Sequence, residues 1–296
     1  MRNFILGTDW WTDCDDVVAM RVLTKAHKKG EINLCGIVLD ACMEDSVRSL
    51  DGFLKLEGCN DIPLGVDEEA TDFEGVPVYQ RRLAPFSTRY TCNADAEVGV
   101  RLYRRILATS RKPVEILEIG FLQVLSSLLE SEGDDISEKT GMELVKEKVS
   151  KFWVMAGKWD GDGEKEHNFC NNARSRKAGK VFCEKCPVPV TFLGFEVGCD
   201  VISGRGLSHD DQLWITMADH GSPNGRSSWD PMLVLLAIIG DEGKAGYEVV
   251  KGRARVDESD GANYFTRSKD GKHAFVVKTK ENAYYEKMID GIIENR

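Results

Sequence analysis

Four carboxylates lie close together near the start of the chain. The stretch over residues 7–16 reads Gly-Thr-Asp-Trp-Trp-Thr-Asp-Cys-Asp-Asp, and it contains Asp9, Asp13, Asp15 and Asp16. Carboxylates this close repel one another in a partly buried site unless a cation lies among them. Helix capping is the competing explanation, but a cap accounts for only one or two of them. The spacing therefore predicts a metal site, and hard oxygen ligands favour calcium or magnesium over zinc.

The flanking sequence indicates where these aspartates lie in the fold. The apolar run Phe4–Leu6 precedes them, and a helical pattern over residues 15–28 follows. In open α/β sheets, ligands bind at the carboxyl ends of the strands. We therefore expect the aspartates at the end of a strand and above the N-terminus of a helix.

Strand-like apolar runs alternate with helical patterns along the chain. The predicted strands are Phe4–Leu6, Leu34–Leu39, Ile62–Leu64, Val114–Leu117, Phe152–Met155 and Val190–Phe195. The predicted helices cover residues 15–28, 44–58, 94–110, 121–131, 170–182 and 230–239. This alternation indicates an α/β fold, a Rossmann-like open and mainly parallel sheet with helices on both faces.

The remaining segments complete this picture. Turn signals at Asp260-Gly261 and Asp270-Gly271, followed by an amphipathic pattern over Tyr284–Ile293, predict a C-terminal β-hairpin and helix addition. We expect the turn-rich segment 66–93 to be a loop over the site and the charged segment 132–146 to be solvated. No linker composition interrupts the chain, which favours a single domain over residues 1–296.

Composition narrows the classes of function. The net charge of −10 disfavours a nucleic-acid partner, and no apolar run reaches the roughly 18 residues that a membrane span needs. The amino terminus lacks the apolar region of a signal peptide. Nine scattered cysteines fit a reducing cytoplasm, and we interpret the one Cys-x-x-Cys, Cys183 to Cys186, as incidental.

The aspartate stretch resembles the amino-terminal signature of the inosine-uridine nucleoside hydrolase family, whose common form is Asp-Thr-Asp-x-Gly-x-Asp-x-Asp-Asp-Ala. The matching residues, in unbroken register, are Thr8, Asp9, Thr12, Asp13, Asp15, Asp16 and the nearby Ala19. Two positions depart from it, because the leading Asp is Gly7 and the turn Gly is Trp11. The resemblance implies a nucleoside or related N-riboside as substrate, a calcium ion, and cleavage of the N-glycosidic bond.

A calcium site is the first implication of the resemblance. Asp9, Asp16, Asp230 and the backbone carbonyl of Ile119 are the expected ligands, with Asp9 also the expected catalytic base for the attacking water. Ile119 precedes a glycine in a strand-to-turn segment like that of the family, and a carbonyl ligand does not depend on its side chain. We expect Asp13 to support these ligands without binding the ion.

Sugar contacts are the second implication. Glu166-His167-Asn168 resembles the family's Glu-Phe-Asn, whose Glu and Asn bind ribose hydroxyls, although a loop that begins a helix would look similar. Asp15 and Asp40 are further expected substrate contacts, Asp40 standing where many members have Asn. We therefore expect these side chains to face the sugar, together with His167.

The departing base is the weakest part of the match. Asp230-Pro231 resembles the start of a family helix, where a His often precedes the Asp and protonates the leaving base; here that residue is Trp229, and an indole is no general acid. His167 is the candidate replacement. A substrate with a better leaving group than a purine would need no acid.

Two alternatives stay open. Gly7, Trp11 and Trp229 fit a non-catalytic or diverged protein that binds a ribosyl ligand on the same fold. The two-residue spacing of Asp13 and Asp15 is also found in magnesium phosphohydrolases of the haloacid-dehalogenase type. Under any of these hypotheses Trp10 and Trp11 could cover the pocket or pack in the core, and the resemblance implies a homodimer or homotetramer.

Overall fold

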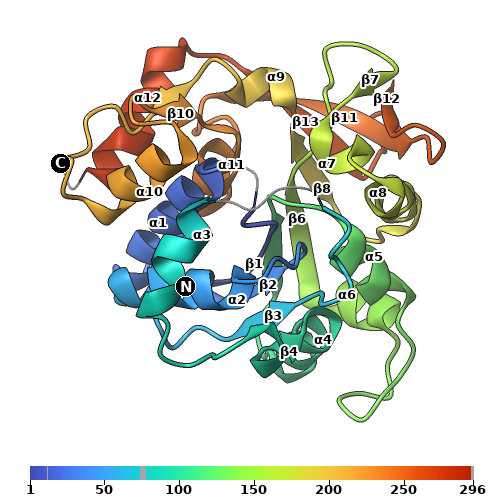
Figure 1. The fold of residues 1–296 in the computed structure, drawn as a ribbon. Coiled ribbons are helices and arrows are strands. Elements are labelled where there is room, and N and C mark those ends of the chain that lie inside the picture. The colour runs from blue at the N-terminus through green and yellow to red at the C-terminus, as the bar shows by residue number, and fades with distance from the viewer. Residues whose placement is uncertain (12, 74–77, 295–296) are drawn as a thin grey trace.

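A twisted, mostly parallel sheet runs through the middle of the molecule in the computed structural model, which describes residues 1–11, 13–73 and 78–294 (Figure 1). Within these residues its strand order is β4-β3-β2-β1-β5-β6-β8-β13-β11-β12-β7. Neighbouring strands are parallel from β4 to β13 and antiparallel from β13 to β7. This arrangement confirms the predicted open, mainly parallel sheet.

The strands have the following bounds: β1 (Arg2–Thr8), β2 (Ile32–Leu39), β3 (Leu64–Val66), β4 (Glu97–Val98), β5 (Val114–Glu118), β6 (Val149–Met155), β7 (Glu164–Lys165), β8 (Val190–Leu193), β9 (Ile202–Ser203), β10 (Arg226–Ser227), β11 (Tyr247–Val256), β12 (Ala262–Arg267) and β13 (His273–Lys278). β9 and β10 pair antiparallel in a separate two-stranded ribbon.

The helices have the following bounds: α1 (Asp15–Lys28), α2 (Ser46–Leu56), α3 (Val78–Leu83), α4 (Gly99–Thr109), α5 (Gln123–Glu130), α6 (Gly141–Lys148), α7 (His167–Cys170), α8 (Ala173–Lys185), α9 (Phe195–Gly198), α10 (Gln212–His220), α11 (Trp229–Ile239) and α12 (Asn282–Ile293), with 3₁₀ turns η1 (Ala84–Phe86) and η2 (Asn93–Asp95). No helix among the described residues is both long and apolar enough to cross a membrane.

Helices cover both faces of the sheet, as the alternating sequence pattern predicts. Figure 1 shows α1, α2, α3, α10, α11 and α12 on one face and α4, α5, α6 and α8 on the other. Strand β1 serves both cores, because successive side chains of a strand point to opposite faces. Phe4 and Leu6 pack with the first set of helices and Ile5 with the second, all three fully buried.

Several predicted boundaries are wrong for local reasons. The helix expected over 94–110 begins only at Gly99, because η2 and β4 occupy the preceding residues. The helix expected over 170–182 is α8, which lies three residues later, since the Asn172 side chain accepts a hydrogen bond from the backbone N–H of Ser175 and starts the helix there. Short helices α6 and α10 were not predicted, because eight or nine residues carry little periodicity.

The C-terminal addition is larger than the predicted hairpin. β13 pairs parallel with β8, and β11 and β12 then extend the sheet antiparallel beyond it. Helix α12 ends the described chain and packs against α1, α11 and β9. The hairpin-and-helix prediction is therefore confirmed in kind, with one more strand than the hairpin contains.

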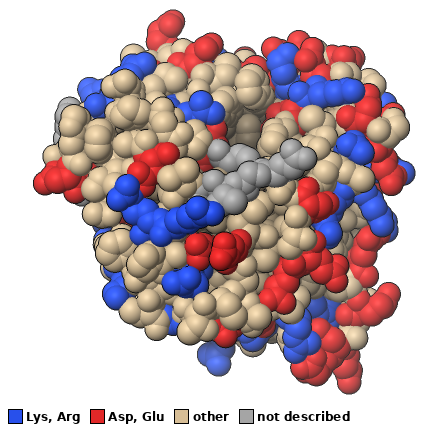
Figure 2. Space-filling model, viewed as in Figure 1, with Lys and Arg blue, Asp and Glu red and all other residues tan. Residues whose placement is uncertain are grey.

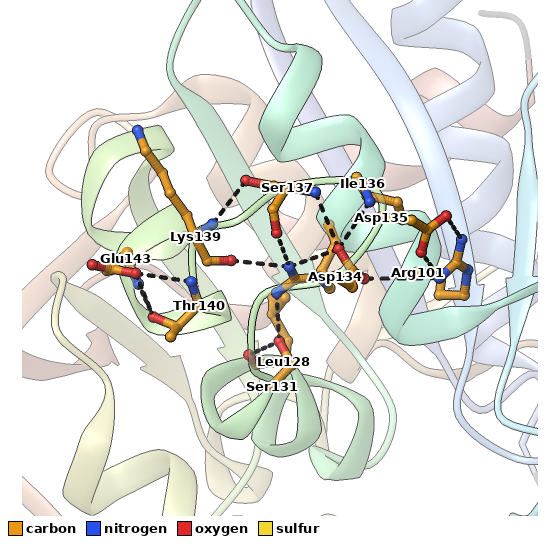
Figure 3. A network of polar contacts seen from close by, with 11 residues as sticks. Arg101, Leu128, Ser131, Asp134, Asp135, Ile136, Ser137, Lys139, Thr140 and Glu143 are labelled. Atoms are coloured by element: carbon orange, nitrogen blue, oxygen red, sulfur yellow. Dashed lines mark hydrogen bonds and ion pairs between the residues drawn. The ribbon is translucent and has the colours of Figure 1, made fainter.

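The charged segment 132–146 is largely exposed up to Thr140, as predicted, but a buried side chain also holds it in place (Figure 3). Arg104 of α4, only 1% exposed, donates hydrogen bonds to both carboxylate oxygens of Asp134 at 2.9 Å. It also donates to the Ser131 hydroxyl and to the backbone carbonyls of Ser137 and Lys139. The segment therefore folds around a buried guanidinium, and we call this group the Arg104 network.

The segment 66–93 makes hydrogen bonds to the backbone of the aspartate loop. Its residues 74–77 lie outside the described part of the chain. The Tyr79 hydroxyl of α3 donates to the backbone carbonyls of Trp11 and Asp13 at 3.3 and 3.1 Å. Gln80 donates to the carbonyl of Trp10 at 2.6 Å. The prediction of a loop is therefore wrong where α3 forms, and the helix fixes the backbone that carries the aspartates.

Candidate functional site

A cavity of about 310 Å³ opens at the carboxyl ends of β1, β5 and β6. The N-termini of α1, α7, α9 and α11 also meet there. The face seen in Figure 2 has basic and acidic side chains interspersed and is hollowed above its centre. The cavity is lined by Asp9, Asp13, Asp15, Asp16, Ile119, Met155, Glu166, His167, Asn168, Phe195, Arg226, Trp229 and Asp230. Most of the predicted site residues therefore converge on one pocket.

Three carboxylates form the tightest group in this pocket. Asp15, Asp16 and Asp230 are 3, 2 and 4% exposed, and each offers an oxygen within 4.8 Å of the others. Asp15 and Asp16 begin α1 and Asp230 lies in the first turn of α11, so two helix N-termini aim at the same point. The backbone N–H of Asp230 donates to Asp15 at 3.1 Å, which ties the two helix ends together.

Backbone and hydroxyl donors orient the remaining oxygens. The Thr8 hydroxyl and the N–H of Trp10 donate to Asp16, and the N–H of Trp11 donates to Asp9 at 3.0 Å. Thr12, a matched position of the motif, lies outside the described residues. Asp9 lines the same pocket at 5% exposure, and the sequence-predicted ligand Ile119 lies beside it.

The electrostatics of this group favour a cation. Burial raises the pKa of Asp9, Asp15, Asp16 and Asp230 well above the usual value for an aspartate, and mutual repulsion raises each further. A divalent ion would reverse that penalty for all of them together. The donors are all oxygens, so the residues present fit a hard cation such as calcium or magnesium. The structure places Asp15 in this group, whereas the sequence predicted it at the sugar.

The two tryptophans of the loop have different surroundings. Trp10 is fully buried, its indole N–H donates to Ser49 at 3.0 Å, and its φ of 49° is the one left-handed conformation of a non-glycine residue among the described residues. Such a conformation costs about 1–2 kcal/mol, which these contacts offset. Trp11 packs against Phe73 and stacks on His167. Neither indole lines the pocket, so core packing is the reading that the structure supports.

The packing of β1 against β5 explains why a glycine occupies position 7. It pairs in register with Glu118 of β5, and a Cβ at position 7 would collide with the Glu118 carboxylate. Glu118 is completely buried and accepts a hydrogen bond from the N–H of Gly120. A carboxylate thus lies beside the leading motif position after all, supplied by the neighbouring strand.

Asp40 lies behind the pocket rather than on its wall. Its carboxyl accepts the N–H of Phe121 at 3.0 Å and hydrogen-bonds to Glu118. Burial raises the pKa of Asp40 well above its usual value and that of Glu118 to about 8, so the two carboxyls are not both ionised near neutral pH. The structure therefore does not bring Asp40 to the cavity, and its expected sugar contact remains a prediction.

Glu166 and Asn168 face the cavity from the start of α7. Glu166 accepts the N–H groups of Asn168 and Gly157 at 2.9 and 2.8 Å, and Asn168 donates to the carbonyl of Met155 at 2.8 Å. Each is 5% exposed. Burial raises the pKa of Glu166 to about 7. Glu166 therefore caps the helix and also borders the pocket, and its expected contact with a sugar hydroxyl stays a prediction.

His167 is poorly suited to protonate a leaving group. Its ring packs against Trp11 and Phe121, and its Nε2 lies 3.2 Å from the Asn171 amide. Burial lowers the pKa of His167, and the nearby Asp13 opposes this shift only in part. The imidazole is therefore mostly neutral near pH 7.

The pocket lining also contains residues that the sequence did not single out, Met155, Phe195 and Arg226. Trp229 stacks on Phe195 with ring centroids 5.3 Å apart and donates its indole N–H to the Phe195 carbonyl at 2.8 Å. Arg226, on β10, forms an ion pair with Asp13. Arg226 could have been suspected from its position three residues before Trp229, the neighbour of the matched Asp230. Nothing in the sequence, however, shows that it contacts Asp13.

Other candidate groups lie outside this chemistry. Asp13, Cys14 and His220 come close enough to hold an ion, but Asp13 is committed to Arg226 and burial raises the pKa of the Cys14 thiol. His273 is a buried histidine, but it lies in β13 and its ring nitrogen accepts the N–H of Ala254 at 3.0 Å.

Comparison with solved structures places this pocket in a known fold. A plant nucleoside hydrolase aligns over 100% of this chain and 99% of its own, with TM-score 0.75 and 12% identity. An inosine-uridine preferring nucleoside hydrolase from Bacillus anthracis aligns over 100% of both chains, with TM-score 0.71 and 13% identity. The type III effector protein XopQ, solved with adenosine diphosphate ribose, aligns over 99% of this chain and 94% of its own, with TM-score 0.69 and 14% identity.

No family model matches the sequence, and neither does any curated protein. The chain therefore has the fold of the nucleoside hydrolases, over its whole length, at low sequence identity.

Proposed function

We propose that this chain is a calcium-dependent hydrolase that cleaves the N-glycosidic bond of a ribonucleoside or related N-riboside. The observation that carries the proposal is the buried group Asp15, Asp16 and Asp230, whose charges lack a direct cationic partner among the described residues. Glu166 and Asn168 border the same cavity, where a sugar could be held. The nucleoside hydrolase fold supports the same reading.

Each residue then has a role that its surroundings permit. Asp9, Asp16, Asp230 and the Ile119 carbonyl would hold the ion, and Asp15 lies close enough to join them. Bound calcium would supply positive charge that orients a water and the sugar diol. Asp9, fixed by the N–H of Trp11, would accept the proton of that water. Glu166 and Asn168 would hold sugar hydroxyls and so fix the ring.

A non-catalytic ribosyl-binding protein is the second candidate. It is favoured by Trp229, which cannot donate a proton where the family often has a His, and by the fold shared with XopQ, solved with adenosine diphosphate ribose. A magnesium phosphohydrolase is less consistent with the pocket, because the Asp13 carboxylate of the required pair is held by Arg226.

We also infer a single unit over the whole chain that works in a reducing compartment such as the cytoplasm. All nine cysteines are free. A homodimer or homotetramer is expected from the resemblance alone, and light scattering at micromolar concentration would measure it.

The experiment that tests the proposal is metal analysis of the purified protein combined with ribose release. The panel contains inosine, uridine and p-nitrophenyl riboside, with and without a chelator. Calcium retention with chelator-sensitive ribose release would support the hydrolase. Calcium retention with ADP-ribose binding by calorimetry and no release would favour the binding protein, and absence of bound calcium would contradict both.

A further inference from the structure

Arg226 is the one arginine or lysine among the described residues that line the pocket, where six carboxylates also gather. It comes from β10, and its guanidinium lies next to the Trp229 ring. Its side chain remains 36% exposed, so a ligand in the cavity can reach it. None of the roles proposed above uses this cation.

Asp13 fixes how the guanidinium is turned. Nε of Arg226 donates to both Asp13 oxygens at 2.9 and 3.0 Å, and Nη2 donates to Oδ2 at 2.5 Å. This side-on pairing uses one edge of the planar group. Nη1 makes no hydrogen bond within the described part of the chain, and its edge is available to a ligand.

The aromatic neighbours indicate what kind of group would lie there. The Arg226 guanidinium carbon is 5.4 Å from the centroid of the Trp229 ring, and that ring stacks on Phe195. Together they form a wall with apolar faces and one cationic donor. A planar aromatic group that carries an acceptor atom matches this wall better than a sugar does.

We propose, on the premise that the ribosidase function above is correct, that Arg226 contacts the departing group and stabilises the negative charge that develops on it. The bond between C1′ and the leaving atom breaks, and its electron pair goes to the leaving atom. The water oxygen bonds to C1′, and the water's proton goes to Asp9. Arg226 donates N–H hydrogen bonds and keeps its protons, and the released anion takes a proton from solvent.

This assignment names the substrate class. Without a proton donor beside the leaving atom, the preferred substrates are ribosides whose aromatic leaving group is stable as an anion. A riboside whose leaving group departs neutral, such as an N-ribosylpyridinium cation, gains nothing from a guanidinium at that place. Arg226 should therefore accelerate the release of anionic leaving groups more than the release of neutral ones. A pocket with neither an acid nor this arginine would not distinguish the two.

The test compares Arg226→Gln with wild type on p-nitrophenyl riboside, which releases an anion, and on an N-ribosylpyridinium, which releases a neutral base. Loss of one preorganised donor typically costs about 10²–10³ in rate. We expect kcat/KM for the phenolate-releasing substrate to fall by about 10²-fold or more. The fall for the pyridinium should be at least about tenfold smaller, and Arg226→Lys should recover part of the difference.

Arg205→Gln is the matched control. Arg205 is 59% exposed, lies against the Gly225 turn beside β10, and does not line the cavity. It should leave both rates unchanged, and thermal melting should show all variants folded. Equal losses on both substrates in Arg226→Gln and Arg226→Lys would overturn the assignment. If calcium-loaded wild type cleaves neither riboside, the failure belongs to the proposed function, and the assignment falls with it.

Discussion

Two regions of this chain contain clustered carboxylates, and they differ in whether a cationic side chain neutralises them. In the Arg104 network, Asp134 receives two hydrogen bonds from a buried guanidinium, and these contacts lower the pKa of Asp134 to about 2 (Figure 3). In the pocket, Asp15, Asp16 and Asp230 face one another without a direct cationic partner among the described residues, and burial raises the pKa of each. In the first region, the Arg104 guanidinium neutralises the Asp134 carboxylate. In the second, a bound cation would compensate the charges.

The difference separates stability from function. A paired and hydrogen-bonded charge stabilises the fold that contains it, whereas uncompensated buried charges destabilise the empty protein and favour a ligand of opposite sign. Substitutions in the pocket should therefore change ligand binding, and substitutions in the Arg104 network should change the free energy of unfolding. The predictions below test that division, from the largest expected effect to the smallest.

Asp16→Ala should abolish both calcium retention and ribose release. Asp16 is one of three carboxylates that share the tightest group, and the ion would lose a ligand that no neighbour replaces. Metal analysis after gel filtration and the ribose assay measure the two losses. Asp135→Asn, at an exposed carboxylate of the Arg104 region, is the control and should keep both. A variant of Asp16 that retains calcium and activity would remove it from the site.

The metal-free protein should lose stability as pH rises from about 4 toward 8. Groups whose pKa is raised by folding favour the folded state below their unfolded pKa near 4, and this contribution is lost as pH rises through the folded values. The pKa of Glu166 is raised to about 7 and that of Glu118 to about 8, with the pocket aspartates also raised. Because several groups add, this loss should exceed those of the substitutions that follow.

Calcium should flatten that dependence, since the bound ion favours the ionised aspartates. Asp134 has the opposite sign, because its pKa is lowered and its contribution is lost only as pH falls below about 4 toward 2. Urea unfolding between pH 5 and 8, with chelator and with calcium, measures the effect. Equal pH profiles in the two conditions would mean that the pocket carboxylates are already compensated without an ion.

Arg104→Gln should destabilise the protein by about 3 kcal/mol. The substitution removes a buried guanidinium that donates to Asp134, Ser131 and two backbone carbonyls. For a chain of this size the melting temperature should fall by roughly 6–12 °C. Activity per folded molecule should not change, and a large drop in calcium affinity would contradict the division between the two regions.

Arg101→Gln should have the smallest effect. Arg101 pairs with Asp135 through two hydrogen bonds of 2.7 and 2.8 Å, but the two side chains are 42 and 71% exposed. Solvent screens such a pair, so its removal should not change the melting temperature measurably. A shift comparable to that of Arg104→Gln would show that exposure does not distinguish the two arginines.

The sequence was sufficient for the parts that depend on local pattern. Buried apolar runs located β1, β2, β5, β6 and β8, and the aspartate motif located Asp15 and Asp16 at the start of α1. The resemblance added Asp230, Glu166 and Asn168, which line the same pocket.

Contacts between segments that are distant in the chain could not be predicted from the sequence. Arg226 meets Asp13 only because β10 and the aspartate loop face one another, and no periodicity encodes that meeting. Asp40 was correctly placed at the carboxyl end of β2, but the sequence does not show that its carboxyl turns toward Glu118 and away from the cavity. Side-chain direction depends on the neighbours that packing supplies.

The contact between Gly7 and Glu118 restricts how this chain can change during evolution. Any side chain at position 7 would collide with the enclosed Glu118 carboxylate, so an Asp there would require the Glu118 side chain to move. Replacing Glu118 by a small residue first would open the space and remove one buried carboxyl, and only then would an Asp at position 7 restore it. The two positions are therefore expected to vary as a pair among relatives, with the carboxylate on one strand or on its neighbour and seldom on both.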